Sequence, residues 1–186
     1  MTDSNRPKNL RDLTFRLRQA LSRAVWKLGS RRLKNPPSVL IVSPGGVAST
    51  LVIQQLAPYV DVNSASDRDG LKHLPRRPNN PVRVLLITGD ASAITASLSR
   101  RGYLGIHCSK FGNLLGVLAP LRTQEAIFRR EIRQQRKSFS RSRHPTLVIE
   151  YDELWDDIGR IASFLSLEDT SFCEDFPAKT KRRNLR

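Results

Sequence analysis

Three short apolar runs, each followed by a turn and then a segment with helical periodicity, constrain the fold more than any other feature. The runs are Val39–Val42, 82–87 and 146–149. Apolar residues recur three or four positions apart in the segments that follow, which is typical of amphipathic helices. Strands that alternate with helices predict a parallel sheet with helices on both faces. We therefore expect an α/β fold with three layers.

The expected helices fill much of the sequence after each strand. They span residues 48–56, 92–101, 122–138 and 155–165. Residues 61–81 are polar and contain three prolines, which predicts a loop, and residues 103–121 are mixed. A chain of 186 residues fits one domain. We place that domain at residues 36–176, between a basic helical extension (1–35) and a basic tail (177–186).

The net charge of +15 is concentrated in three segments. Residues 1–35 hold ten basic and two acidic side chains, and residues 122–143 hold eight basic and two acidic ones. Residues 177–186 add five basic side chains and no acidic one. This charge indicates an anionic partner, such as a nucleotide, a sulfated or phosphorylated substrate, a nucleic acid or a membrane surface.

The N-terminal extension predicts an amphipathic helix that ends at Gly29. Its apolar residues recur at helical spacing: Leu10, Leu13, Leu17, Leu21, Ala24, Val25 and Leu28. Basic residues lie between them. Such a helix packs on its own domain, binds a protein partner or lies on an anionic surface. We favour the first two outcomes over the third.

Several classes of protein are excluded by composition. Two cysteines, Cys108 and Cys173, are too few for a disulfide framework, and no His/Cys/Asp cluster has the spacing of a metal site. No run of 18 apolar residues predicts a membrane span. The polar start lacks the apolar segment of a secretory signal, so we expect a cytoplasmic protein without a metal.

The turn after the first strand is a candidate phosphate-binding loop. Gly45 and Gly46 allow backbone amides to converge on an anion at a helix N-terminus, and Ser49 and Thr50 add hydroxyl groups. The pattern G-x-x-x-x-G-K-[ST] is absent, so the nucleotide-triphosphatase motif does not apply. An ordinary capped turn between strand and helix is the alternative.

Four stretches, in this order, resemble the sulfotransferase family, whose P-loop-like α/β enzymes use 3′-phosphoadenosine 5′-phosphosulfate as donor. Residues 39–51 (VLIVSPGGVASTL) resemble the strand and loop that bind the 5′-phosphosulfate. Residues 71–75 (LKHLP) are similar to the segment that carries the general-base histidine. Residues 82–101 resemble the strand and helix that bind the 3′-phosphate. Residues 146–167 resemble the ending with strand, Tyr-Glu-Asp-Leu, helix and Phe-Leu-Gly-Leu.

The resemblance implies roles for particular residues. The loop residues would hold the 5′ side of the donor, and they are Gly45, Gly46, Val47, Ala48, Ser49 and Thr50. Ser97, together with Arg100 or Arg101, would bind the 3′-phosphate, helped by Arg182 and Arg183 of the tail. His73 would be the general base, because imidazole titrates near neutral pH. Lys72 would stabilise the transferring group.

The chain departs from the family at two cations. The family's basic loop residue is Gly45 here, and its strand-end arginine is Gly89. Charge that develops during sulfuryl transfer needs positive groups nearby. Either of the arginines after Ser97, or the basic tail, is expected to replace them.

For the remaining histidines and the tryptophans, and for His73 as an alternative, the sequence predicts roles other than catalysis or binding. His73 is alternatively a surface-loop histidine, and His107 and His144 are expected to be structural or exposed. Trp26 and Trp155 are expected to be packing residues on helix faces.

We therefore expect an enzyme that transfers a sulfuryl group from the donor nucleotide to a hydroxyl or amine acceptor, whose identity stays open. The lost cations keep a second hypothesis open, a non-catalytic protein of the same fold that binds a partner. A third is a nucleic-acid-binding protein that uses the helix at 122–138 and both basic ends.

Overall fold

The computed structural model describes residues 7–29, 31–168 and 171–179. Strands β1 (Val39–Val42), β2 (Arg83–Thr88) and β3 (Thr146–Glu150) form a parallel sheet in the order β1-β2-β3. An isolated parallel bridge joins Val39 to Val62 at the free edge of β1. Every residue of β1 is buried, as expected for a parallel strand covered on both faces.

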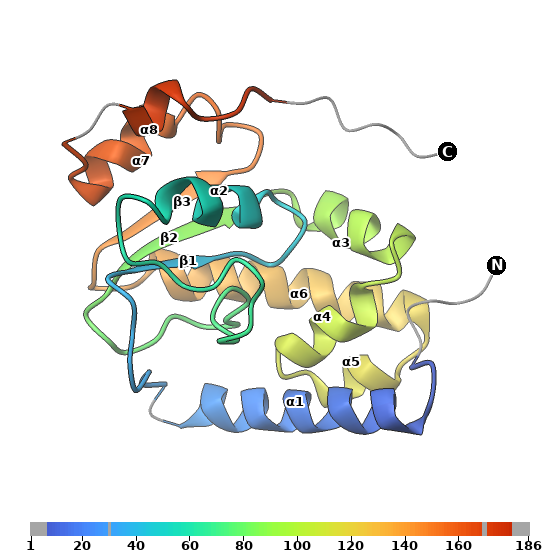
Figure 1. Cartoon of the computed structure of the whole chain (residues 1–186). Coiled ribbons are helices and arrows are strands. Elements are labelled where there is room, and N and C mark those ends of the chain that lie inside the picture. Colours follow the sequence, from blue (N-terminus) through green and yellow to red (C-terminus); the bar gives the residue numbers. More distant parts are fainter. Residues whose placement is uncertain (1–6, 30, 169–170, 180–186) are drawn as a thin grey trace.

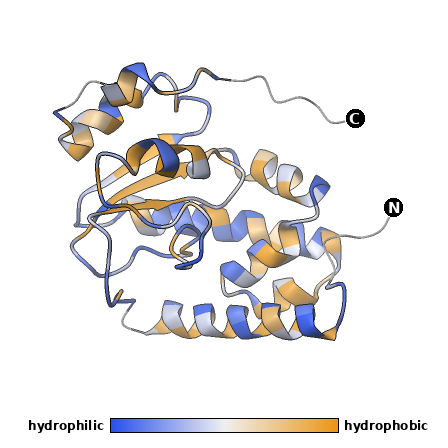
Figure 2. Ribbon diagram, in the orientation of Figure 1, coloured by the Kyte–Doolittle hydropathy of each residue, from blue (hydrophilic) through white to orange (hydrophobic). Residues whose placement is uncertain are grey.

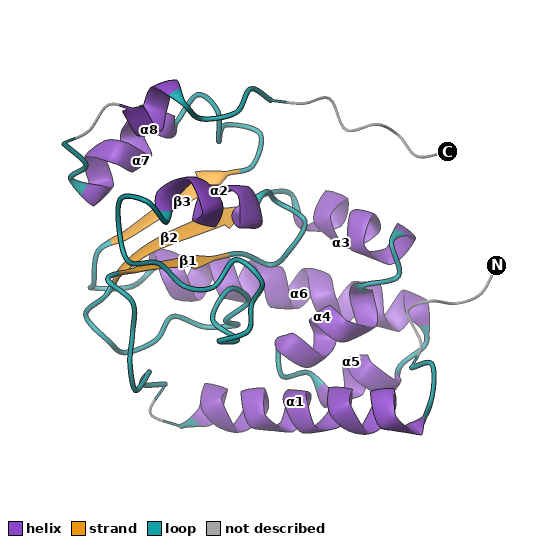
Figure 3. Cartoon of the chain, viewed as in Figure 1, coloured by secondary structure: helices purple, strands orange, loops and turns teal. Residues whose placement is uncertain are grey.

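Helices flank the sheet on both sides (Figure 1, Figure 3). The helices α2 (Ser49–Leu56), α7 (Ile158–Leu165) and α8 (Ser171–Glu174) lie on one side, and α6 (Leu121–Ser140) lies on the other. Ile41 and Leu85 join a core with residues of α2 and α7. Leu40 and Leu86 pack with Phe139 of α6. The predicted α/β class is confirmed.

The remaining helices pack against α6 or against one another. Helices α3 (Ala91–Arg100), α4 (Leu104–Lys110) and α5 (Leu114–Leu118) follow β2 along the chain. Helix α1 (Leu10–Leu28) contacts α4 and α5 and runs along the edge of the molecule farthest from α2 and α7 (Figure 1). Within the described residues, no helix is both long and apolar enough to cross a membrane.

The main difference from the expected elements lies after β3. A helix was expected from residue 155, but α7 begins at Ile158. Successive turns replace its first part, because the amides of Glu153, Asp156 and Asp157 bond to carbonyls three or four residues earlier within the turn region. This places Trp155 in a turn beyond the carboxyl end of β3. The mixed region 103–121 forms two short helices, α4 and α5.

Candidate functional site

The loop between β1 and α2 requires left-handed backbone at three positions. Gly45, Gly46 and Ala48 have φ angles of 107°, 72° and 57°. A Cβ at position 45 would lie 2.5 Å from Cε1 of the buried His107 ring. Glycine is therefore needed there for both conformation and space. No basic side chain fits at position 45 without moving that ring.

A cation reaches the loop from α3 instead. A Cβ at Gly46 would lie 2.8 Å from Nη2 of Arg101, so the guanidinium group occupies the space above this glycine. Arg101 also donates from Nε to the carbonyl of Ser97, at 3.1 Å, which holds the side chain along the end of the helix. Both candidate arginines are exposed, but the structure places Arg101 at the loop and leaves Arg100 outside the cavity lining.

The first turn of α2 directs unbonded amides toward the same place. In the described part of the chain, the backbone N–H groups of Val47, Ala48, Ser49 and Thr50 have no hydrogen-bond acceptor. Ala48, the residue before the helix, provides no side-chain cap. Such amides, together with the helix dipole, favour an anion. Ser49 uses its hydroxyl as the acceptor for Ser43, at 2.8 Å.

A cavity of about 460 Å³ opens between the loop, the end of α3 and the turn after β3. Its lining comprises Gly46, Ala48, Ser49, Thr50, Leu51, Ser97, Arg101, Tyr151 and Trp155. A smaller cavity of about 150 Å³ shares Gly46 and Tyr151 with it and reaches Gly89 and Asp90. Both lie beyond the carboxyl ends of the strands, where ligands bind in parallel sheets.

Trp155 forms one wall of the larger cavity, which the sequence analysis did not predict. Its ring packs edge-to-face on Tyr151, with 5.5 Å between centroids, and its Nε1 donates to the carbonyl of Pro177. Nζ of Lys179 lies 5.3 Å from the Trp155 ring centroid. The sequence does contain a signal for this role. Trp155 comes shortly after the end of the third strand, where ligands bind in parallel sheets, and before the helix is formed. Arg182 and Arg183, the predicted tail cations, lie outside the described residues.

Lys72 contacts the start of α2 from outside the cavity lining. Its Nζ donates to Oγ1 of Thr50, at 3.0 Å, and to the carbonyl of Ala65. Burial lowers the pKa of Lys72 from its ordinary value. The candidate catalytic lysine therefore contacts the first turn of α2 through Thr50, although it is absent from the cavity lining.

His73 lies beneath the loop and away from the cavity lining. Its Nδ1 lies 2.9 Å from the carbonyl oxygen of Ser43, so the neutral ring donates there. Its Nε2 lies 4.0 Å from Oδ2 of Asp67. Burial, with a further contribution from the charge of Lys110, lowers the pKa of His73 to about 3. The expectation of a surface-loop histidine is wrong, because only 6% of this residue is exposed.

His107 completes a buried pair with His73. The two rings meet edge-to-face with 4.8 Å between centroids, and His107 also packs on Phe128. Burial lowers the pKa of His107 well below its ordinary value. Its Nδ1 has no hydrogen-bond partner in the described part of the chain. His107 therefore packs beneath the loop as a neutral ring.

Two further predicted site residues line the two cavities. Ser97 lines the larger cavity and Val47 the smaller one. Among the described residues, no three His, Cys, Asp or Glu side chains form a group that could hold a metal ion.

Comparisons of the chain with protein-family models, curated proteins and solved structures find no match.

Proposed function

We propose that this protein binds 3′-phosphoadenosine 5′-phosphosulfate at the loop 44–50 and transfers its sulfuryl group to a hydroxyl or amine acceptor. The observation that carries this proposal is the position of Arg101, whose guanidinium lies over Gly46 within a cavity that Ser97 also lines. A positive charge therefore stands beside the loop although the loop itself has none.

The cavity supplies the groups that an anionic nucleotide needs. The amides at the start of α2 and the Arg101 guanidinium suit phosphate or sulfate oxygens. Ser97 adds a hydroxyl beside Arg101, in agreement with the role that the family resemblance implies. The ring of Trp155 offers an aromatic face, and stacking of a base on such a face stabilises binding by about 1–3 kcal/mol. The volume of about 460 Å³ is within the usual range of ligand pockets.

In the transfer step, the acceptor oxygen or nitrogen would form a bond to sulfur while the bond from sulfur to the 5′-phosphate oxygen breaks. The departing phosphate gains negative charge, and the acceptor's proton passes to water in the open cavity. Arg101 lies beside Gly46 of the loop, and Lys72 reaches the loop through Thr50. Such charges lower the barrier when they are already in position.

The state of His73 supports a second candidate, a protein of this fold that binds the nucleotide or a partner without transfer. A general base works best with a pKa near the working pH. His73 is buried, donates to Ser43 and has a pKa of about 3. In this arrangement it positions the loop, and the acceptor proton needs another route.

Calorimetric titration with adenosine 3′,5′-bisphosphate, with adenosine as the control, tests the binding step. We expect saturable binding of the bisphosphate and none of adenosine. Absence of binding at millimolar bisphosphate would contradict the proposal. A transfer assay with the sulfated donor and simple phenols or amines then separates the two candidates, because the second predicts no product whether or not the nucleotide binds.

A further inference from the structure

Helix α1 turns part of its charged side chains inward. Arg16 forms an ion pair with Asp12, at 2.9 Å, and is buried. Lys27 forms an ion pair with Glu131 of α6, at 3.0 Å, and Arg23 donates to the carbonyl of Gly70. Two of these polar contacts, those of Lys27 and Arg23, join α1 to the rest of the protein, alongside the fully buried Ala20.

The opposite side of α1 exposes large apolar side chains. The residues concerned, which we name the α1 outer face, are Leu10, Leu21, Val25 and Leu28, with Phe15 at its margin. Leu28 is 89% exposed and Leu10 is 76% exposed. Spacings of seven and eleven residues bring Leu10, Leu21 and Leu28 onto one line, since 3.6 residues make a turn. Figure 2 shows the alternation of hydrophobic and hydrophilic residues along this helix.

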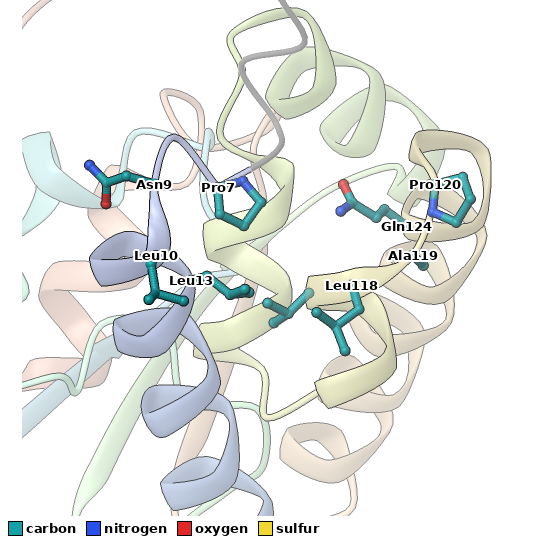
Figure 4. A pocket seen from close by; sticks show the side chains of 9 residues that line it. Pro7, Asn9, Leu10, Leu13, Leu118, Ala119, Pro120 and Gln124 are labelled. Carbon is teal, nitrogen blue, oxygen red and sulfur yellow. The ribbon is translucent and has the colours of Figure 1, made fainter.

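The apolar surface continues onto α5. Leu115 and Leu118 are 76% and 64% exposed, and α5 contacts α1. Side chains of Leu10, Leu13 and Leu118 face a shared hollow at the start of α1, a cavity of about 530 Å³ (Figure 4). Exposed apolar patches of this kind mark interaction surfaces in water-soluble proteins.

The charges beside the α1 outer face are positive. Lys8, Arg11 and Arg18 are exposed along or just before the helix. The acidic residue of α1, Asp12, is paired inward with Arg16. Arg32 and Lys34 are exposed shortly beyond the helix end. A partner that fits must combine an apolar layer with negative charge at its margin.

We propose that the α1 outer face lies in the plane of an anionic lipid surface, with its leucines in the acyl boundary and its basic residues among the headgroups. A helix with apolar and basic strips binds membranes in this orientation. Nineteen residues at 1.5 Å each give a straight contact about 28 Å long. A second copy of the chain fits less well, because a twofold contact through this face brings Arg11 and Arg18 close to the same cations.

Sedimentation with vesicles tests the proposal on the full chain. We expect binding to phosphatidylcholine vesicles that contain about one-third phosphatidylserine, and weak binding to phosphatidylcholine alone. Each basic residue near an anionic surface contributes about a five-fold change in affinity, so the double variant R11Q/R18Q should bind about 25-fold more weakly. Added salt should weaken binding by wild type.

The apolar part is tested by the double variant L21Q/L28Q, which changes no charge. We expect vesicle binding to fall about ten-fold or more, because two leucines leave the acyl boundary. The control A96Q/A126Q alters exposed positions on α3 and α6 and should bind like wild type. Circular dichroism melts should be similar for all three proteins, since the substituted side chains are exposed.

Three results would overturn the proposal. One is equal binding to neutral and anionic vesicles, or none to either at low salt. Another is wild-type affinity in L21Q/L28Q. The third is a concentration-dependent dimer, measured by light scattering, that L21Q/L28Q abolishes, because the face would then serve a second copy.

Discussion

The two glycines of the loop face opposite environments. Gly45 lies against the buried ring of His107, whereas Gly46 faces the guanidinium of Arg101 at an open cavity. Beneath the loop two neutral histidines pack together, and above it a cation stands beside unbonded amides. The comparison teaches that two adjacent residues separate a packed side of the loop from a side that opens to a cavity. Arg101, at the end of a neighbouring helix, brings a positive charge to the open side.

Gly45→Ala should have the largest effect, and the effect should be on stability. The new Cβ would lie 2.5 Å from a buried ring, at a φ of 107° that alanine rarely adopts. Overpacking costs about 1–3 kcal/mol and left-handed backbone about 1–2 kcal/mol, so we expect a loss of about 3 kcal/mol. For a chain of this size, the melting temperature should fall by about 6–12 °C.

Gly46→Ala is the matched control for that prediction. Its Cβ would meet the end of the flexible Arg101 side chain, which can move. We therefore expect a melting temperature closer to wild type and a weaker anion affinity. Equal destabilisation by both substitutions would show that the two sides of the loop do not differ in this way.

The buried histidines predict a pH-dependent stability. The pKa of His73 is about 3 in the folded protein and about 6.5 when unfolded, so below pH 6.5 the unfolded chain binds an extra proton. The free energy of unfolding should therefore decrease as pH falls from 6.5 toward 3, by up to about 1.4 kcal/mol per pH unit for this residue. His73→Asn keeps a donor for Ser43 and should flatten that slope.

Urea unfolding of wild type and variant at pH 7 and pH 5 measures the difference. His144→Asn is the control, since His144 lies in a turn before β3, away from the buried pair. It should leave the slope unchanged. A His73→Asn variant with the full wild-type slope would show that His73 is not buried as a neutral ring.

Gly89→Arg should give the smallest effect, a gain in anion binding. A Cβ at Gly89 would be 3.7 Å from Ile94 and Tyr151, an ordinary contact distance. The position borders the smaller cavity, so an arginine there adds a cation beside the site. We expect affinity for adenosine 3′,5′-bisphosphate to rise by up to about 5-fold, the gain expected from an additional exposed charge pair worth up to about 1 kcal/mol. Gly89→Gln should bind like wild type, and an equal gain in both variants would exclude a charge effect.

Sequence alone predicted the alternating elements and the glycine loop well, because strand runs and turn residues are local signals. The resemblance pointed to Ser97, and helical spacing placed the pair Arg100/Arg101 beside it. The choice of Arg101 depends on where the end of α3 meets Gly46, which is a tertiary contact. The burial of His73 and the wall formed by Trp155 likewise depend on packing between segments distant in sequence.

The orientation of α1 was beyond prediction for a different reason. Leucines at helical spacing usually face a core. Here Arg23 and Lys27 find partners at distant positions in the fold, and those contacts turn part of the apolar strip outward. Periodicity indicates which residues share a face but not which face is buried.

The most direct test of the central claim compares Arg101→Gln with Arg100→Gln by calorimetric titration with adenosine 3′,5′-bisphosphate. The two arginines are adjacent, but Arg101 lines the cavity and Arg100 does not. Loss of a charge-assisted contact costs about 1.5–3 kcal/mol, so Arg101→Gln should weaken binding by about 10–100-fold. Arg100→Gln should bind like wild type. Equal affinities for both variants and the wild type would contradict the claim that Arg101 replaces the cation missing from the loop.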